Sequence, residues 1–157
     1  MIIVSDTSAI TALLQIHRIE VLPQLYAGVI IPHEVAIELR RYHPTLPAFI
    51  QVLRVTDADR FRRLRAELDL GEAAAITLML EGKGDLLLID ERRGRSIARR
   101  EGLAIIGVVG VLLEARVRGL VPSLREVLHD LESTAGFRVA AEIKIRALQV
   151  SGETDAP

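Results

Sequence analysis

The sequence predicts an α/β protein with a parallel sheet covered by helices on both faces, and three observations support this fold class. Short aliphatic runs recur along the 157 residues, and a stretch with helical signals follows each of them. The runs are almost continuously apolar, as is typical of strands buried on both faces. Half of the residues are hydrophobic but only 3% are aromatic, so we expect an aliphatic core. A chain of this length suits one domain, which we expect over residues 1–150, with residues 151–157 as a frayed tail.

Turn and cap signals divide the first half of the chain into strands and helices. Ser8 can cap a helix over Ala9–Ile16. Pro32 suits the first turn of a helix and precedes Glu34–Arg41. The aliphatic runs that we expect as strands are Ile2–Val4, Val29–Ile31, Val52–Val55, Leu86–Ile89 and Ala104–Ile106.

Similar signals define the helices of the second half. Asp57 can cap Ala58–Leu68, and Gly71 is expected to separate that helix from Glu72–Glu81. A helix over Arg92–Glu101 has basic residues in its last turn and Gly102 just beyond it, which is typical of a helix C-terminus. The C-terminal third is then expected to be helical over Gly107–Arg118, Leu124–Ser133 and Val139–Gln149.

Four acidic residues are expected at one edge of this sheet. Open parallel sheets bind ligands beyond the carboxyl ends of their strands, where Asp6 follows the first strand and Asp90 ends the fourth. Glu72 opens a helix that returns antiparallel to the strands, so it belongs to the same edge. Glu38 is further into its helix, but its side chain leans back towards the helix start. Asp85 precedes its strand and is expected at the opposite edge.

Carboxylates gathered at one edge repel one another unless a cation binds between them. Oxygen ligands favour Mg²⁺ or Mn²⁺, with waters and a substrate phosphate completing the coordination. Such a metal can activate water and stabilise the oxygens of a phosphodiester displacement. Arg92, Arg93 and Arg95 begin the next helix on this edge and are candidates to bind the flanking phosphates.

Each of these residues also has a purely structural interpretation. Asp6 can serve as a turn or cap residue, and Glu72 can complement a helix dipole. Glu38 can form an ion pair with Arg41 on an exposed helix face. The arginines at 92–100 can likewise lie on a solvated surface. The functional interpretation depends on the shared edge rather than on any one residue.

Four segments resemble PIN-domain proteins, and more narrowly the prokaryotic VapC-toxin-like branch, which is predicted to bind nucleic acid. They are Ile3–Ser8, Val29–Pro32 with Glu38-Leu39, Gly71–Ile76 and Leu88–Arg95. The resemblance implies a three-layer α/β/α fold with strand order 3-2-1-4-5. It also implies a Mg²⁺- or Mn²⁺-dependent ribonuclease with an acidic site at Asp6, Glu38, Glu72 and Asp90, supported by Thr7, Ser8 and Glu91.

The same resemblance implies single-stranded RNA as substrate, a cognate antitoxin and a homodimer. Two departures from the family pattern would weaken metal binding. Glu72 stands where most PIN nucleases have Asp, and Glu91-Arg92-Arg93-Gly94 replaces a stretch that often carries another Asp. A catalytically weak PIN-like module that binds RNA or protein is therefore the main alternative. Cleavage of RNA with Mg²⁺ or Mn²⁺ that stops with EDTA would distinguish the two.

Several other classes lack their required residues. A response-regulator receiver needs a Lys after its last strand, but the two lysines are Lys83 and Lys144. A P-loop and a Gly-x-Gly-x-x-Gly motif are absent from the sequence. The chain has no Cys, which excludes thiolate metal sites and disulfides, and its net charge is −1. Its apolar runs are shorter than the roughly 18 residues of a membrane span, and its start does not resemble a signal peptide, so we expect a cytoplasmic protein.

Overall fold

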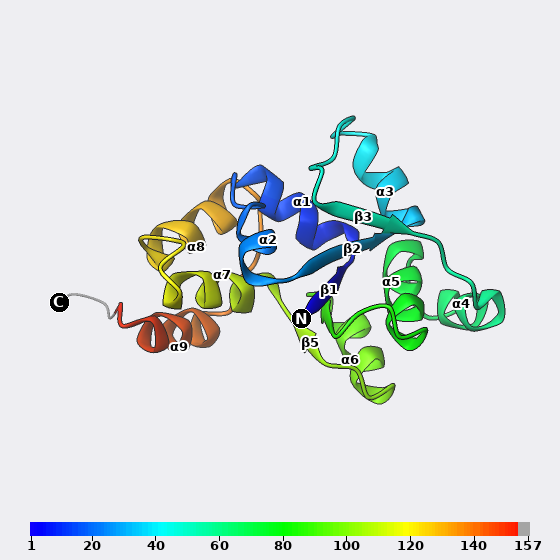
Figure 1. Ribbon diagram of the computed structural model, residues 1–157. Coiled ribbons are helices and arrows are strands. Elements are labelled where there is room, and N and C mark those ends of the chain that lie inside the picture. Colours follow the sequence, from blue (N-terminus) through cyan, green and yellow to red (C-terminus); the bar gives the residue numbers. More distant parts are fainter. Residues whose placement is uncertain (154–157) are drawn as a thin grey trace.

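The computed structural model describes residues 1–153, which form a five-stranded parallel sheet between two layers of helices (Figure 1). The strand order is β3-β2-β1-β4-β5, and each neighbouring pair is parallel. The predicted fold class and strand order are thereby confirmed. The strands are β1 (Ile2–Ser5), β2 (Gly28–Pro32), β3 (Ile50–Leu53), β4 (Leu86–Leu88) and β5 (Ile105–Ile106).

The helices of the described chain alternate with these strands and then fill the C-terminal third. Within residues 1–153, every helix is too short or too polar to span a lipid bilayer. The helices are α1 (Thr7–Gln15), α2 (Val21–Leu25), α3 (His33–Arg40), α4 (Ala58–Arg65), α5 (Leu70–Leu80), α6 (Arg92–Arg100), α7 (Val108–Val117), α8 (Leu124–Ser133) and α9 (Ala141–Ser151).

Each central strand contributes side chains to two separate apolar cores. Ile3, Val29 and Leu88 pack on the face covered by α1–α3 and α7–α9. Val4 and Leu87, one residue along in their strands, pack on the other face, which α4–α6 cover. Because successive side chains of a strand point to opposite faces, burial on both faces requires the continuous aliphatic runs from which the strands were predicted.

Two helix starts differ from the sequence expectation. Asp6, not Ser8, is the N-cap of α1, and its side chain accepts a hydrogen bond from Ala9 N–H. Asp69 is the N-cap of α5, so Gly71 lies inside the first turn of that helix instead of separating two helices. An Asp at each position can accept from the free N–H groups of the first turn. Consequently, two acids of the carboxyl edge also begin helices.

The third strand begins two residues earlier than expected, because its register with β2 decides its limits. Ile50 pairs with Val29, and Leu53 pairs with Pro32, the last residue of β2. Beyond that point Thr56 leaves the sheet, and its N–H and hydroxyl donate to the Glu81 carboxylate at 3.0 and 2.6 Å. The short helix α2 has no counterpart among the predicted helices.

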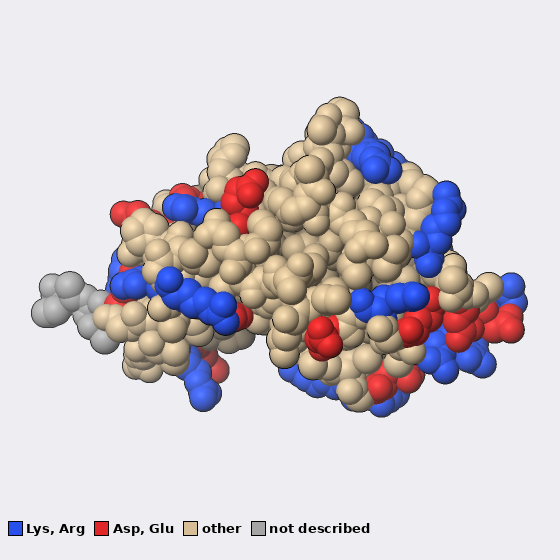
Figure 2. Space-filling view, in the orientation of Figure 1, with Lys and Arg blue, Asp and Glu red and all other residues tan. Residues whose placement is uncertain are grey.

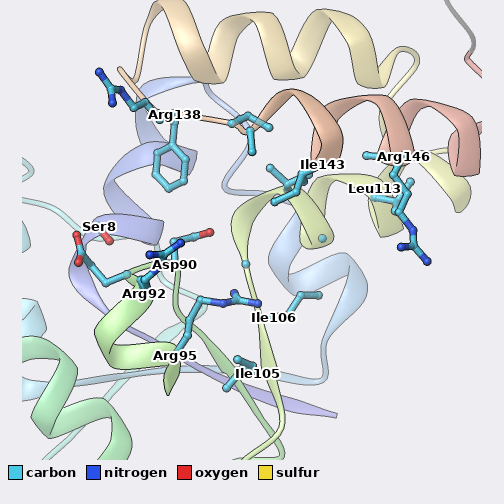
Figure 3. A pocket seen from close by; sticks show the side chains of 18 of the residues that line it. Ser8, Asp90, Arg92, Arg95, Ile105, Ile106, Leu113, Arg138, Ile143 and Arg146 are labelled. Carbon is cyan, nitrogen blue, oxygen red and sulfur yellow. The ribbon is translucent and has the colours of Figure 1, made fainter. Parts of the chain in front are cut away.

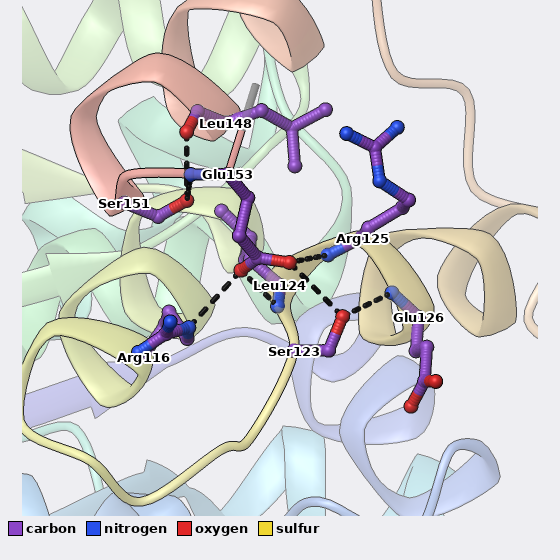
Figure 4. Close-up of polar contacts among 8 residues, drawn as sticks. All are labelled: Arg116, Ser123, Leu124, Arg125, Glu126, Leu148, Ser151 and Glu153. Carbon is purple, nitrogen blue, oxygen red and sulfur yellow. Dashed lines mark hydrogen bonds and ion pairs between the residues drawn. The ribbon is translucent and has the colours of Figure 1, made fainter. Parts of the chain in front are cut away.

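The prediction of a frayed tail over residues 151–157 is wrong for residues 151–153. Ser151 ends α9, and Gly152 follows with φ of 82°. Glu153 then accepts hydrogen bonds from Leu124 N–H at 2.6 Å and from Ser123 Oγ and Arg116 Nε, both at 3.0 Å (Figure 4). These contacts fasten the end of α9 to the start of α8. The remaining part of the predicted tail, residues 154–157, lies outside the described residues.

Candidate active site

Asp6 occupies the centre of the carboxyl edge, directly after β1. It is only 3% exposed, and its carboxylate accepts from Ala9 N–H at 3.2 Å and from Ser8 Oγ at 3.4 Å. Its own N–H donates to Leu88 O of β4 at 3.4 Å. Burial raises the pKa of Asp6 to about 7 against the effect of the Ala9 hydrogen bond, and the charge of Asp90 raises it further. A carboxylate at this position is electrostatically destabilised near neutral pH.

Glu72 lies in the first turn of α5 and is 7% exposed. Its backbone N–H donates to Asp69 at 2.8 Å, but its Oε2 is buried without a hydrogen-bond partner among the described residues. The backbone of α6 passes directly over it, since a Cβ on Gly94 would stand 2.7 Å from that oxygen. Burial, followed by the charge of Asp69, raises the pKa of Glu72 to about 7. An unpartnered buried oxygen of this kind lacks a ligand or a proton donor.

Asp90 lies between β4 and α6 and connects the sheet to α7. Val108 is the first residue of α7, and its N–H donates to Asp90 Oδ1 and Oδ2 at 3.3 and 3.1 Å. The close approach requires Gly107, where a Cβ would lie 2.6 Å from Asp90 Oδ1. Burial raises the pKa of Asp90 above its ordinary value, although the Val108 hydrogen bond and the charge of Arg95 act in the opposite direction.

Glu38 and Thr7 approach the site from its other side, next to Gly71. A Cβ on Gly71 would lie 3.0 Å from Thr7 Oγ1 and 3.7 Å from Glu38 Oε1. The hydroxyl of Thr7 is buried without a hydrogen-bond partner among residues 1–153. α3 therefore brings Glu38 close to Gly71, the residue directly before Glu72 at the start of α5.

The electrostatics connect these acids and add one that sequence reasoning missed. The charges of Asp90, Glu72 and Asp69 all raise the pKa of Asp6. Asp69 also shares a side-chain hydrogen bond with Glu72 that raises the pKa of Glu72, and Glu91 raises it too. Asp69 precedes Gly71-Glu72 at capping distance in the sequence, and that spacing is the signal by which it could have been found.

The donor chemistry of the site fits a hard divalent cation. Asp6, Glu72 and Asp90 offer oxygen atoms, and the unpartnered Glu72 Oε2 lies among acids that repel it. In the part of the chain that the structure describes, no three acidic or histidine side chains are grouped closely enough to hold a metal by themselves. Mg²⁺ usually takes only one or two carboxylates and completes its shell with water and substrate phosphate. The chain's residues therefore suit an ion that shares its coordination with substrate.

The structure separates the three arginines at the start of α6. Arg95 is half-buried and donates from Nη1 to Ile89 O at 2.8 Å, close to Asp90. Arg93 points elsewhere, since its Nε donates to Glu67 O at 2.8 Å and its Nη2 lies 3.8 Å from Glu67 Oε1. Arg92 lies with Arg95 at the rim of a groove that opens beside Asp90.

This groove, which we call the α6–α9 groove, extends from the acidic site along β5 and α7 to α9. Its volume is about 1180 Å³. Figure 3 shows Ser8, Asp90 and Arg92 at one end, and Leu113 and Arg146 at the other. The exposed Glu91 also lies at the acidic end. Asp90 and Glu91 thus line the groove, whereas Asp6 and Glu72 are buried and are not among its lining residues.

The fold and this edge define an α/β protein with acidic residues gathered at the carboxyl ends of β1 and β4. The family model of DUF3368, described as a PIN domain, matches residues 2–153. The chain belongs to the PIN-domain family. A comparison with curated proteins gives no match. PIN domains are generally nucleases that act on nucleic acid and usually use divalent metal ions.

Proposed function

We propose that the protein is a metal-dependent endoribonuclease that hydrolyses phosphodiester bonds in single-stranded RNA. The observation that carries this proposal is the pair of buried carboxylates Asp6 and Glu72, whose pKa values are both raised to about 7. They lie at the carboxyl edge together with Asp90 and Glu38. Acids with such perturbed pKa values are typical of catalytic sites, and the neighbouring Asp90 lines the α6–α9 groove.

Each acid has a different structural setting in this proposal. The N-terminus of α1 fixes Asp6, and the N-terminus of α7 fixes Asp90. Glu72 keeps one oxygen unpartnered for a ligand, and Glu38 approaches beside Thr7. When bound, Mg²⁺ or Mn²⁺ supplies an acidified water and stabilises charge on the phosphodiester oxygens. Arg92 and Arg95 hold the phosphates next to the bond that is cleaved.

A PIN-like module that binds RNA or protein with little or no cleavage is the second candidate. It is favoured by one observation: within residues 1–153, no three metal-ligating side chains are grouped closely enough to hold an ion unaided. The longer side chain of Glu72 and the lack of a further Asp in Glu91-Arg92-Arg93-Gly94 point in the same direction. Under this alternative the acids would bind a cation weakly and the groove would still bind its partner.

The resemblance to VapC-like toxins supports two further parts of the proposal. The protein acts in the cytoplasm as the toxin of a toxin–antitoxin pair, and a cognate antitoxin holds it inactive. It also forms a homodimer. Growth arrest on induced expression, relieved by co-expression of the neighbouring reading frame, is the expected outcome for the toxin role.

Cleavage of a fluorophore–quencher RNA tests the nuclease itself. We expect cleavage with Mn²⁺, none with EDTA, and a loss of at least about 100-fold in Asp6→Asn and Glu72→Gln, because each removes a charge from the acidic site. Asp59→Asn is the matched control, since Asp59 is an exposed acid that pairs with Arg62 on α4. Cleavage that persists in EDTA would overturn the metal dependence, and cleavage that persists in Asp6→Asn would overturn the role of the acidic site. Metal-dependent stabilisation without any cleavage would establish the second candidate.

A further inference from the structure

The wall and floor of the α6–α9 groove are apolar and mostly aliphatic. Ile105 and Ile106 of β5 form one side, and α7 and α9 form the rest. Two of the α9 side chains are well exposed, with Ile143 at 54% and Val150 at 61%. The aliphatic lining residues are Ile105, Ile106, Val109, Leu113, Val139, Ile143 and Val150. Exposed aliphatic side chains that share one depression are typical of interaction sites.

The groove also runs along a free edge of the sheet. β5 is the last strand in the order, and its residues 104 and 106 accept from Leu87 N–H and Ile89 N–H of β4. In a parallel ladder, the residue between two such positions directs its N–H and C=O away from the partner strand. Ile105 therefore presents both groups on the outer side of β5, where no further strand lies within residues 1–153. An unpaired edge of this kind can accept an added strand.

The rim of the groove also carries basic residues. Arg99, Arg138 and Arg146 line it, and none of the three forms an ion pair or side-chain hydrogen bond with another residue in 1–153. On α6, by contrast, Arg100 is paired with Glu67 at 3.1 Å. Three unpaired guanidinium groups around an apolar floor complement an anionic partner that also carries apolar side chains.

The composition of the floor favours a protein segment over a nucleic acid. Bases of single-stranded RNA are bound mainly by stacking on aromatic side chains, and Phe137 is the one aromatic residue that the described groove contains. Branched aliphatic side chains instead pack against the alternating side chains of an extended peptide. The free Ile105 N–H and C=O provide the main-chain pairing that such a peptide needs.

We infer that the α6–α9 groove binds an extended segment of a partner protein, with alternating aliphatic and acidic residues, as an added strand beside β5. The aliphatic residues pack between β5 and α9. The acidic residues face Arg99, Arg138 and Arg146. The groove adjoins the acidic site at Asp90, but the segment binds beside β5 and α9, and its binding does not depend on the proposed nuclease activity.

Selection from a displayed library of random peptides of about ten residues, performed on the whole chain in EDTA, tests this inference. We expect the selected peptides to be enriched in Val, Ile and Leu alternating with Asp and Glu. A synthetic selected peptide should lose affinity by roughly tenfold or more in the Arg99→Glu, Arg146→Glu double variant, because both contacts become repulsive. Arg63→Glu, in the exposed part of α4, is the matched control and should bind normally.

Two further measurements distinguish binding in this groove from non-specific hydrophobic binding. Ile143→Asn should weaken binding, whereas Ile145→Asn should not, because Ile145 is equally exposed at 50% on the same helix but does not line the groove. On peptide binding, exchange of the Ile105 amide hydrogen should slow by about tenfold or more.

The inference fails if no peptide is selected or if the selected peptides show no acidic enrichment. It also fails if Ile145→Asn is as damaging as Ile143→Asn. An uncleaved single-stranded RNA that displaces the peptide and depends equally on Arg99 and Arg146 would assign the groove to nucleic acid instead. Because all binding is measured in EDTA, a failure of the proposed nuclease leaves these outcomes unchanged.

Discussion

Two opposing effects act on the pKa of Asp6. Ala9 N–H, 3.2 Å away, stabilises its charge, while burial and the neighbouring acids destabilise it and raise the pKa to about 7. In the unfolded chain the same group has a pKa near 3.8. The folded protein therefore binds a proton at Asp6 more tightly than the unfolded chain does, and stability from this group is lost as the pH rises from about 4 through 7.

Replacing Asp6 with Asn should stabilise the metal-free protein at high pH. Asn caps helices as well as Asp does, so the main change is the removal of a buried negative charge. We expect Asp6→Asn to exceed wild type in free energy of unfolding by on the order of 1–3 kcal/mol at pH 8. The difference should shrink towards pH 4. Urea unfolding in EDTA across this range checks it, and a variant less stable than wild type at pH 8 would contradict the electrostatic account.

Gly94 is required by the close contact between α6 and Glu72. A Cβ there would stand 2.7 Å from Glu72 Oε2 and 2.6 Å from Ile89 Cδ1. Gly94→Ala should therefore lower the free energy of unfolding by about 1–3 kcal/mol through overpacking, although Ala favours helices. Ser96→Ala, at an exposed position of the same helix, is the control. Thermal unfolding of both variants is the measurement, and a stabilised Gly94→Ala would exclude this packing.

Among the helices and strands, α9 depends on a contact that its own sequence does not reveal. Burial alone would raise the pKa of Glu153, but hydrogen bonds from the Leu124 and Arg125 N–H groups, Ser123 and Arg116 lower it. Stability from this lowered pKa is present above the unfolded value and is lost as the pH falls through the folded one. Figure 4 shows how this one carboxylate joins α7, α8 and the end of α9.

Neutralising that carboxylate should loosen α9 first. We expect Glu153→Gln to lower the free energy of unfolding by about 0.5–2 kcal/mol, as for the loss of a helix cap. Amide exchange should accelerate in α9 more than in the sheet. Glu20→Gln is the control, because Glu20 is exposed and makes no cap hydrogen bond. Equal acceleration in both variants would show that Glu153 does not hold the helix.

Sequence reasoning located the central strands because burial on both faces leaves a strong apolar signal. It could not decide which of two nearby cap residues begins a helix, as with Asp6 and Ser8, since both types accept the same hydrogen bonds. The start of β3 depended on register with β2, which is a contact between distant segments. The edge that Asp6, Glu72 and Asp90 share followed from chain direction alone. The direction of the Arg93 side chain could not be predicted in this way, because it depends on a hydrogen bond to Glu67.

Over the whole molecule, charge is distributed in local groups rather than in one field. On the face in Figure 2, basic and acidic side chains are mixed around α4, and a broad uncharged area lies beside them. Ion pairs such as Arg60–Asp57 and Arg62–Asp59 account for part of this mixture. RNA binding should therefore depend on Arg92 and Arg95 near the acidic site and not on net charge.

The salt dependence of RNA binding distinguishes these arginines. Replacing Arg92 and Arg95 with Ala should weaken binding across RNA sequences and flatten the plot of log K against log salt by about 0.7 per lost phosphate contact. Arg93→Ala should leave the slope unchanged, because Glu67 already engages that guanidinium. Fluorescence anisotropy in EDTA gives the slopes. If only Arg93→Ala changed the slope, the phosphate contacts would belong to Arg93 and not to Arg92 and Arg95.

The caps at Asp6 and Asp69 have an evolutionary consequence. A helix start accepts Ser, Thr or Asn as readily as Asp, and at Asp6 a neutral residue would avoid burying a charge beside other acids. Folding alone would thus allow, and at Asp6 even favour, exchange of the acid for an uncharged cap. A descendant that no longer needed the acidic site should drift to Asn or Ser at this position while keeping the helix, so an Asp retained there records selection for its charge.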